Sequence, residues 1–185
     1  MNVLLRIAKG IDWVNERLGG FVCRLTLAMV LVASYNTIAR YFGRYVGLNL
    51  TSNALLETQW YLFSVVFLLG AAYALRHNVH VRVDVVYAHL HARARTWINL
   101  IGGGLLLLPF SIFAIWASWR PVYSSWRIHE ISPDPGGLPR YPIKMLIPVA
   151  FLLIILQGVA EMIKLAAFLR RGEEPESKKN HAGTL

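Results

Sequence analysis

Four long apolar stretches dominate this chain and restrict the folds that it can adopt. They lie at about residues 19–41, 55–75, 97–119 and 144–169. A helix of about 20 residues crosses a hydrocarbon core about 30 Å thick, and each stretch reaches that length. Only 16% of the 185 residues are charged, whereas soluble domains contain about a quarter. We therefore predict an all-α integral membrane protein with four transmembrane helices.

The segments outside these stretches are short. In residues 1–18, apolar residues recur every three or four positions between charged ones, which predicts an amphipathic helix lying in the membrane interface. Residues 170–185 are polar and predict a mobile cytoplasmic tail. The chain thus divides into an interfacial helix (1–18), a four-helix transmembrane domain (19–169) and the tail, which leaves no room for a soluble catalytic domain.

The basic residues predict the orientation in the membrane. Eleven of the 19 Lys and Arg residues lie in the N-terminal segment, the second connection and the tail, against six in the other two connections. Lys and Arg favour the cytoplasmic side, so both termini are expected in the cytoplasm. Because these residues are scattered around apolar segments, the net charge of +9 fits contact with lipid headgroups and predicts no nucleic-acid partner.

Six histidines and one cysteine raise the question of a metal or haem site. The histidines all lie outside the predicted spans, whereas haem b needs axial histidines that project from the spans into the bundle. Neighbouring histidines such as His77 and His80 lack a clear set of further metal ligands. Cys23 has no second cysteine to pair with. We predict no cofactor, no metal site and no catalytic residue, hence no enzyme.

Charged residues at the ends of the spans are candidates for contacts. Glu57 lies in the opening turn of the second span, where a negative charge meets the positive end of the helix dipole. Arg40 ends the first span on the same side, which predicts an ion pair between the two. Glu161 and Lys164, three residues apart in the fourth span, predict a second pair. Glu57 as a proton carrier is the alternative, although that role needs a deeper carboxylate.

Small residues and prolines predict two further features. Gly70 lies among small residues in the second span, which let another helix approach closely. Four prolines fall within residues 132–142, which predicts a stiff, non-helical loop before the fourth span. This loop is expected to contribute to a docking surface, with Arg140 as its exposed cation. Pro109 lies inside the third span and predicts a kink there.

The order of these motifs resembles that of a known family. The motifs are LETQW at 56–60, LGAAYAL at 69–75, NVHVRVD at 78–84 and SPDPGGLP at 132–139. Over about residues 20–165 they resemble the small membrane subunit, of the DctQ type, of tripartite ATP-independent periplasmic (TRAP) transporters. The candidate structural or partner-interface residues are Arg40, Glu57, Trp60, Gly70, Tyr73, His80, Asp84, Gly137, Leu138, Pro139 and Arg140.

The resemblance implies a non-catalytic subunit in the bacterial inner membrane. It would scaffold a much larger membrane subunit that carries the substrate and sodium sites. A soluble periplasmic binding protein would deliver the substrate, typically a small molecule with a carboxylate. The chain agrees with this role because it lacks the repeats and broken helices of a complete transporter. Two alternatives stay open: a self-sufficient proton-coupled exporter, and a membrane anchor that binds haem or quinone.

Overall fold

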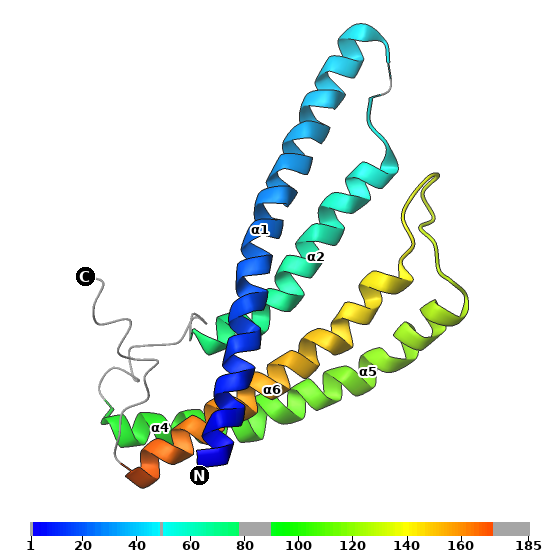
Figure 1. Cartoon of the computed structure of the whole chain (residues 1–185). Coiled ribbons are helices and arrows are strands. Elements are labelled where there is room, and N and C mark those ends of the chain that lie inside the picture. Colours follow the sequence, from blue (N-terminus) through cyan, green and yellow to red (C-terminus); the bar gives the residue numbers. More distant parts are fainter. Residues whose placement is uncertain (1, 49, 78–89, 172–185) are drawn as a thin grey trace, which may run out of the picture.

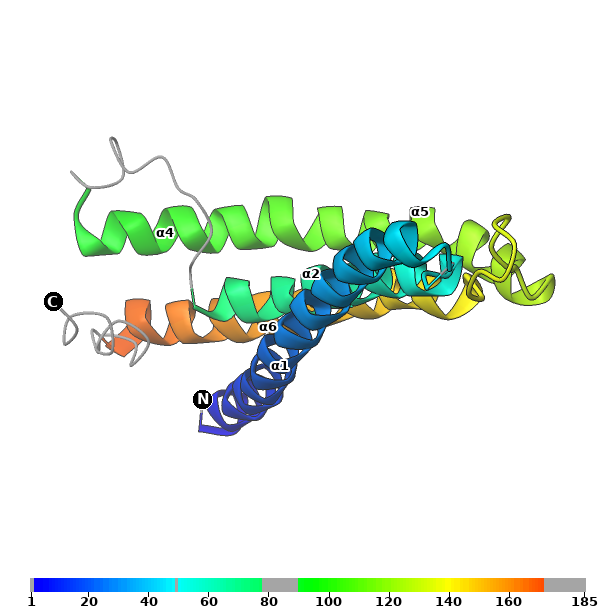
Figure 2. The same ribbon diagram turned by 90° about the horizontal axis from the view of Figure 1, so that it is seen from above.

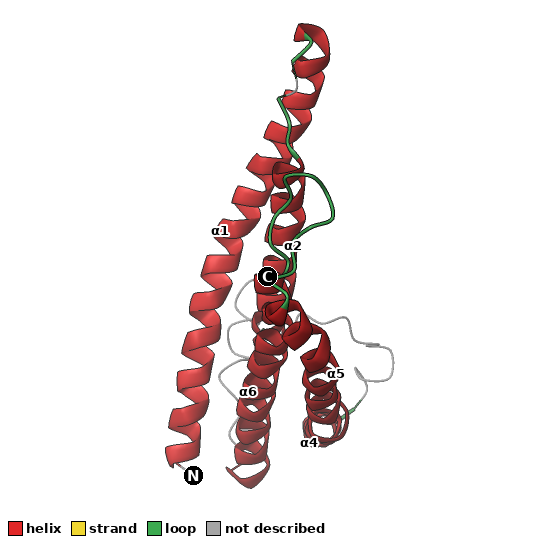
Figure 3. Ribbon diagram, turned by 90° about the vertical axis from the view of Figure 1, so that its right-hand side faces the viewer, coloured by secondary structure: helices red, strands yellow, loops and turns green. Residues whose placement is uncertain are grey.

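The computed structural model describes residues 2–48, 50–77 and 90–171, all as helices and loops (Figures 1 and 3). The elements are α1 (Asn2–Val46), α2 (Asn53–Arg76), α4 (Ala92–Gly102), the π-helical segment η1 (Gly103–Leu107), α5 (Leu108–Arg127) and α6 (Tyr141–Arg171). Four helical stretches are long and apolar enough to cross a membrane: Val3–Val46, Asn53–Arg76, Arg93–Arg127 and Tyr141–Arg170. Each predicted span falls within one of them, which confirms, for the described residues, an all-helical chain with four helices able to cross a membrane.

Local sequence signals explain where the first two helices end and begin. Gly47 adopts a φ of +72° just after α1, a backbone conformation that glycine adopts without strain and that commonly ends helices. Ser52 is extended, and its Oγ accepts a hydrogen bond of 3.3 Å from the N–H of Leu55. This N-cap satisfies one of the free N–H groups at the start of α2.

The helix α6 is the centre of the bundle. It packs against α1, α2, α4 and α5, whereas α1 packs against α2 and α6. From above, α5 runs alongside α6 while α1 crosses the pair at an angle (Figure 2). The residues that become buried are mostly small, such as Ala72, Ala150 and Ala160, and most large apolar side chains are exposed. This distribution is that of helices whose outer surfaces face lipid or another membrane protein.

The N-terminal segment differs from the sequence prediction in its boundary. Residues 1–18 were predicted as a separate helix, but α1 continues without a break from Asn2 to Val46 (Figure 1). Nothing in the sequence around Gly19 and Gly20 interrupts the hydrogen-bonded ladder, since glycine only weakens a helix. A straight helix of this length extends about 67 Å, roughly twice the hydrocarbon thickness. The interfacial position of its first turns stays a prediction.

The third span is irregular near its proline, although its form differs from a simple kink. Residues 103–107 are π-helical, and Pro109 lies in the first turn of α5. Proline has no N–H to donate to the carbonyl four residues earlier, which is that of Leu105. A π-helical turn accommodates the missing bond by shifting the pattern by one residue. The span therefore consists of α4, η1 and α5 in series.

Two neighbouring glycines of α1 differ in the space around them and provide a test of helix packing. A Cβ on Gly19 would lie 2.2 Å from the ring of Tyr73 on α2, whereas a Cβ on Gly20 would meet nothing within 4 Å. We expect Gly19→Ala to destabilise the protein by about 1–3 kcal/mol through overpacking. Gly20→Ala should be neutral or stabilise by up to about 1 kcal/mol. Thermal unfolding of the purified protein measures both, and equal effects would contradict the packing described here.

Candidate functional site

Polar side chains gather in two clusters at opposite ends of an apolar layer. Glu57 belongs to one cluster and Arg76 to the other, and the helix between them has no charged residue. Their separation of 19 positions along α2 corresponds to about 28 Å, close to the thickness of a hydrocarbon core. The end of α1 and the loop 128–140 lie at the Glu57 end, and the start of α1 and the end of α6 lie toward the other (Figure 1).

At the first cluster, Glu57 holds the loop between α5 and α6. Its side chain is buried, with 3% of the residue exposed. The hydroxyl of Ser132 donates to Oε1 of Glu57, and the backbone N–H of Leu138 donates to Oε2. The N–H of Ser132 donates to the carbonyl of Leu138 at 3.1 Å. The carboxylate therefore closes the loop on itself, and we call this arrangement the Glu57 clamp (Glu57, Ser132, Leu138).

The loop fits tightly against the clamp and against α2. A Cβ at Gly137 would lie 2.5 Å from the Cβ of Ser132 and 2.8 Å from Oε2 of Glu57. The hydroxyl of Tyr61 donates to the carbonyl of Pro139 at 2.9 Å, and Nδ2 of Asn53 donates to that of Pro135 at 3.0 Å. Contacts along the first three turns of α2 therefore fix the loop at several points.

Arg140 lies near the clamp, and a second cation, Lys144, follows it in the first turn of α6. The guanidinium of Arg140 lies 5.9 Å from the ring centroid of Trp60, a cation–π distance. The prediction of Arg140 as an exposed cation is wrong in part, because the residue is only partly exposed and its buried Nε has no hydrogen-bond partner within the described residues. Lys144 donates to Glu130, and this hydrogen bond lowers the pKa of the Glu130 carboxyl, further helped by the charge of Arg140. Glu130 thus stays ionised at neutral pH and ties the start of the loop to α6.

The structure brings together many of the candidate residues at this end of the bundle. They are Glu57, Trp60, Gly137, Leu138, Pro139 and Arg140. The sequence motifs alone did not single out Ser132 as a partner of Glu57. Its position at the start of a proline-rich turn, where serine commonly bonds nearby backbone groups, was the available signal.

The predicted ion pair between Arg40 and Glu57 is wrong. Arg40 is exposed on α1 and has no ion pair within the described residues, while the oxygens of Glu57 accept from Ser132 and Leu138. The contact of Gly19 with Tyr73 sets the register of the two antiparallel helices. Counted from that contact, Arg40 is level with residue 52, which is five positions, or about 7 Å, beyond Glu57.

The other candidates lie elsewhere. A Cβ at Gly70 would be 3.7 Å from Val22, an ordinary contact, so of these two glycines Gly19 is the more tightly packed. The ring of Tyr73 lies against Gly19, and its centroid is 4.3 Å from that of His77. His80 and Asp84 lie outside the described residues.

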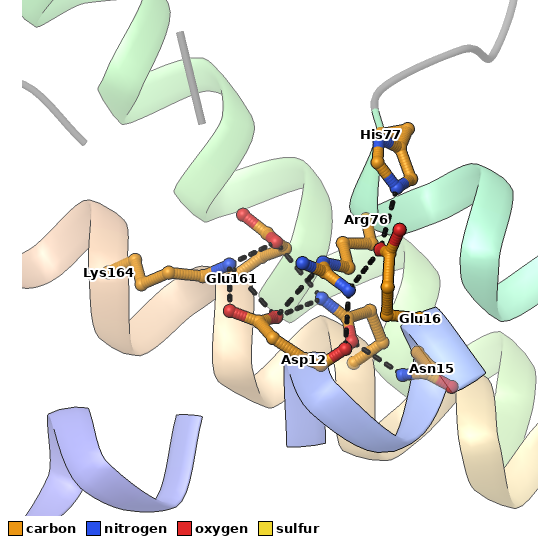
Figure 4. Close-up of polar contacts among 8 residues, drawn as sticks. Asp12, Asn15, Glu16, Arg76, His77, Glu161 and Lys164 are labelled. Carbon is orange, nitrogen blue, oxygen red and sulfur yellow. Dashed lines mark hydrogen bonds and ion pairs between the residues drawn. The ribbon is translucent and has the colours of Figure 1, made fainter. Parts of the chain in front are cut away.

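The second cluster joins three helices through buried and half-buried polar groups (Figure 4). We call it the three-helix polar cluster. It consists of Asp12, Asn15 and Glu16 on α1, Arg76 and His77 at the end of α2, and Gln157, Glu161 and Lys164 on α6. The predicted pair of Glu161 and Lys164 is confirmed. Neither Asp12 nor Gln157 was predicted to take part.

Gln157 and Asp12 connect the members of this cluster. Gln157 is fully buried; it accepts from Asn15 at 2.5 Å and donates to Asp12 at 2.9 Å and to Glu161 at 3.0 Å. Asp12 also accepts from Lys164 through both oxygens, at 3.2 Å each. A polar residue inside an apolar span, such as Gln157, was the sequence signal for this network, because burial in a membrane demands hydrogen-bond partners.

On the other side of the cluster, α2 ends against α1. Arg76 donates to the carbonyl of Asp12 and to the carboxylate of Glu16. Nε2 of His77 lies 3.2 Å from the same carboxylate. No group of three or more His, Cys, Asp and Glu side chains within the described residues is placed to hold a metal ion. Both clusters thus hold helices or a loop in place through hydrogen bonds and ion pairs.

The fold defines the class of multi-pass, all-helical membrane proteins. The polar side chains of the two clusters form hydrogen bonds and ion pairs between helices and a loop of this same chain. A sequence model of the family described as tripartite ATP-independent periplasmic transporters, DctQ component, matches residues 29–168. The chain therefore belongs to the DctQ family and is a small permease subunit of a TRAP transporter. No curated protein matches the chain.

Proposed function

We propose that this chain is the scaffold of its transporter in the bacterial inner membrane. It holds a larger membrane subunit that performs sodium-driven uptake of a small, carboxylate-bearing solute, which a periplasmic binding protein delivers. The Glu57 clamp is the observation that supports this proposal most. In this clamp, the buried carboxylate of Glu57 holds the loop 128–140 in place at one end of the bundle.

The orientation follows from the basic residues. The excess of Lys and Arg at the end that carries the N-terminus places the three-helix polar cluster on the cytoplasmic side. The loop 128–140 then faces the periplasm. The proposal accordingly gives the two clusters different tasks: one joins α1, α2 and α6 near the cytoplasm, and the other presents a fixed surface to the periplasm.

The loop is suited to contact a periplasmic partner because it is already ordered. Backbone hydrogen bonds join Ser132 to Leu138 at 3.1 Å and Arg140 to Glu130 at 2.8 Å. A surface that is fixed before binding loses little conformational entropy when a partner docks. Arg140 beside this surface attracts an acidic partner and accelerates association.

The exporter alternative needs Glu57 to exchange protons during transport. Both carboxylate oxygens of Glu57 accept hydrogen bonds from the loop, and Gly137 packs directly against them. Each exchange would have to break these contacts. The haem or quinone alternative has less support, since the described histidines, His77, His91 and His129, lie at or beyond helix ends.

Reconstitution tests the proposal. Vesicles would contain the larger subunit with or without this chain, and the binding protein would carry radiolabelled solute in the presence of a sodium gradient. We expect uptake only when both membrane subunits are present, and none from this chain alone. Uptake by the larger subunit without this chain would remove the scaffold function. Proton-driven transport by this chain alone would establish the exporter instead.

A further inference from the structure

Arg24 stands out among the charged residues of the spans. Arg24 is the single charged residue within the apolar stretches of the four spans. These stretches run between Arg17 and Arg40, Glu57 and Arg76, Arg95 and Arg120, and Lys144 and Glu161. Arg24 is exposed on α1. Within the described residues, it has no hydrogen bond, ion pair or ring contact.

The register of α1 against α2 gives the depth of Arg24. A Cβ on Gly19 would overlap Tyr73, and one on Gly70 would contact Val22, so Arg24 is level with residue 68 of α2. This level is eight positions, about 12 Å, from the three-helix polar cluster at Arg76 and about 17 Å from Glu57. Arg24 therefore lies well inside the apolar layer.

The side chain of Arg24 is too short to leave this layer. Five bonds of about 1.5 Å separate its Cα from its Cζ, which gives a reach of roughly 6 Å. Even when it points toward the cytoplasmic end, as helical side chains do on α1, about half of the distance remains. Charged side chains at such depth face protein or a water-filled cavity and pair with another group.

We propose that Arg24 marks the face of α1 that packs against the larger membrane subunit, where it pairs with an Asp or Glu carboxylate in a transmembrane helix of that subunit. This inference rests on the proposed function. The exposed face continues along α1 through Leu27 and Leu31, which are 63% and 62% exposed, to Ile38. Beside Arg24, Gly20 leaves open space, which lets a second helix approach closely.

The positive charge of Arg24 favours the larger subunit over lipid or a second copy of this chain as the neighbour of this face. Lipid chains offer no acceptor at this depth, and the phosphates lie at the membrane surface. A second copy of this chain, related by a two-fold axis along the membrane normal, would bring two Arg24 side chains together at the same depth. Like charges in a low dielectric repel strongly. A carboxylate of a different subunit satisfies Arg24 without either conflict.

Co-purification of the two membrane subunits tests the pairing. We expect Arg24→Leu and Arg24→Glu to lower the amount of larger subunit retained by the tagged chain by about tenfold or more. Arg24→Lys keeps the charge and should stay within about threefold of the wild type. Arg40→Leu is the matched control, because Arg40 is also exposed and unpaired among the described residues of α1 but lies beyond the apolar layer.

Two further measurements connect the loss to the contact itself. The Arg24 variants expressed alone should keep the size-exclusion profile of the wild type, which shows that they fold. A membrane-embedded Asp or Glu of the larger subunit replaced with Arg should restore retention by Arg24→Glu. A photoreactive phenylalanine analogue in place of Leu27 should crosslink to the larger subunit, whereas the same analogue in place of Phe67 on α2 is the control.

The outcomes separate this inference from the proposed function. Wild-type retention by Arg24→Leu would show that the residue faces lipid and would overturn the inference, while the scaffold function would stand. Crosslinks from position 27 to a second copy of this chain alone would overturn it as well. If the wild-type chain retains no larger subunit, the proposed function fails, and the inference that rests on it fails too.

Discussion

Replacing Glu57 with alanine is expected to lower uptake by the reconstituted transporter by about tenfold or more. The substitution removes the acceptor of the Ser132 hydroxyl and of the Leu138 N–H. A buried donor without a partner is costly, so the loop 128–140 should leave its position on α2 and lose its fixed surface. The measurement is the initial rate of solute uptake at several concentrations of the binding protein.

Two variants serve as controls for this result. Glu57→Gln keeps one carbonyl oxygen as an acceptor, so the loss should be smaller, about threefold. Asp134→Asn removes a carboxylate of the same loop that lies outside the clamp, so uptake should fall much less than in Glu57→Ala. Normal uptake by Glu57→Ala would show that the clamp has no function. Complete loss in Glu57→Gln with an intact complex would instead indicate that Glu57 exchanges protons.

The sequence predicted the four spans, the proline-rich loop and Glu57 as a contact residue, since each prediction depends on local composition. Apolar length marks the four helical stretches, and four prolines within 11 residues predict the loop before α6, although the isolated Pro121 and Pro148 lie inside helices. The partner of Glu57 could not be predicted in the same way. Ser132 and Leu138 lie 75 and 81 positions away, and only the packing of α2 against α6 brings them to the carboxylate.

The three-helix polar cluster could not be predicted from the sequence pattern either. The periodicity of residues 1–18 correctly indicated a helix but directed attention to its apolar stripe. The residues that are buried against the bundle, such as Ala8 and Asn15, lie along one edge of this stripe, while Leu4 and Ile7 within the stripe are exposed. Which side of α1 packs inward depends on its rotation and crossing angle against α6, which a single helix pattern does not contain.

This cluster also gives a physical reason for the unbroken length of α1. Asp12 and Asn15 belong to the segment that was predicted as a separate helix, yet they bond to Lys164 and Gln157 of α6. These contacts need the first turns of α1 in line with its span. A break at residue 18 would move the two side chains away from α6 and leave Gln157 without partners from α1. Buried polar groups thus select the continuous helix.

Asp12→Ala is accordingly expected to destabilise the protein by about 2–3 kcal/mol, because it leaves Lys164 and Gln157 each without one acceptor. For a chain of this length, that loss corresponds to a decrease of roughly 4–12 °C in the midpoint of thermal unfolding. Glu16→Ala is the matched control on the same helix. The Glu16 side chain is 50% exposed, against 18% for Asp12, so solvent screens its ion pair with Arg76 and the loss should stay below about 1 kcal/mol. Equal shifts for the two variants would contradict a central role of Asp12, since of these two residues Asp12 bonds to α6 whereas Glu16 bonds to the end of α2.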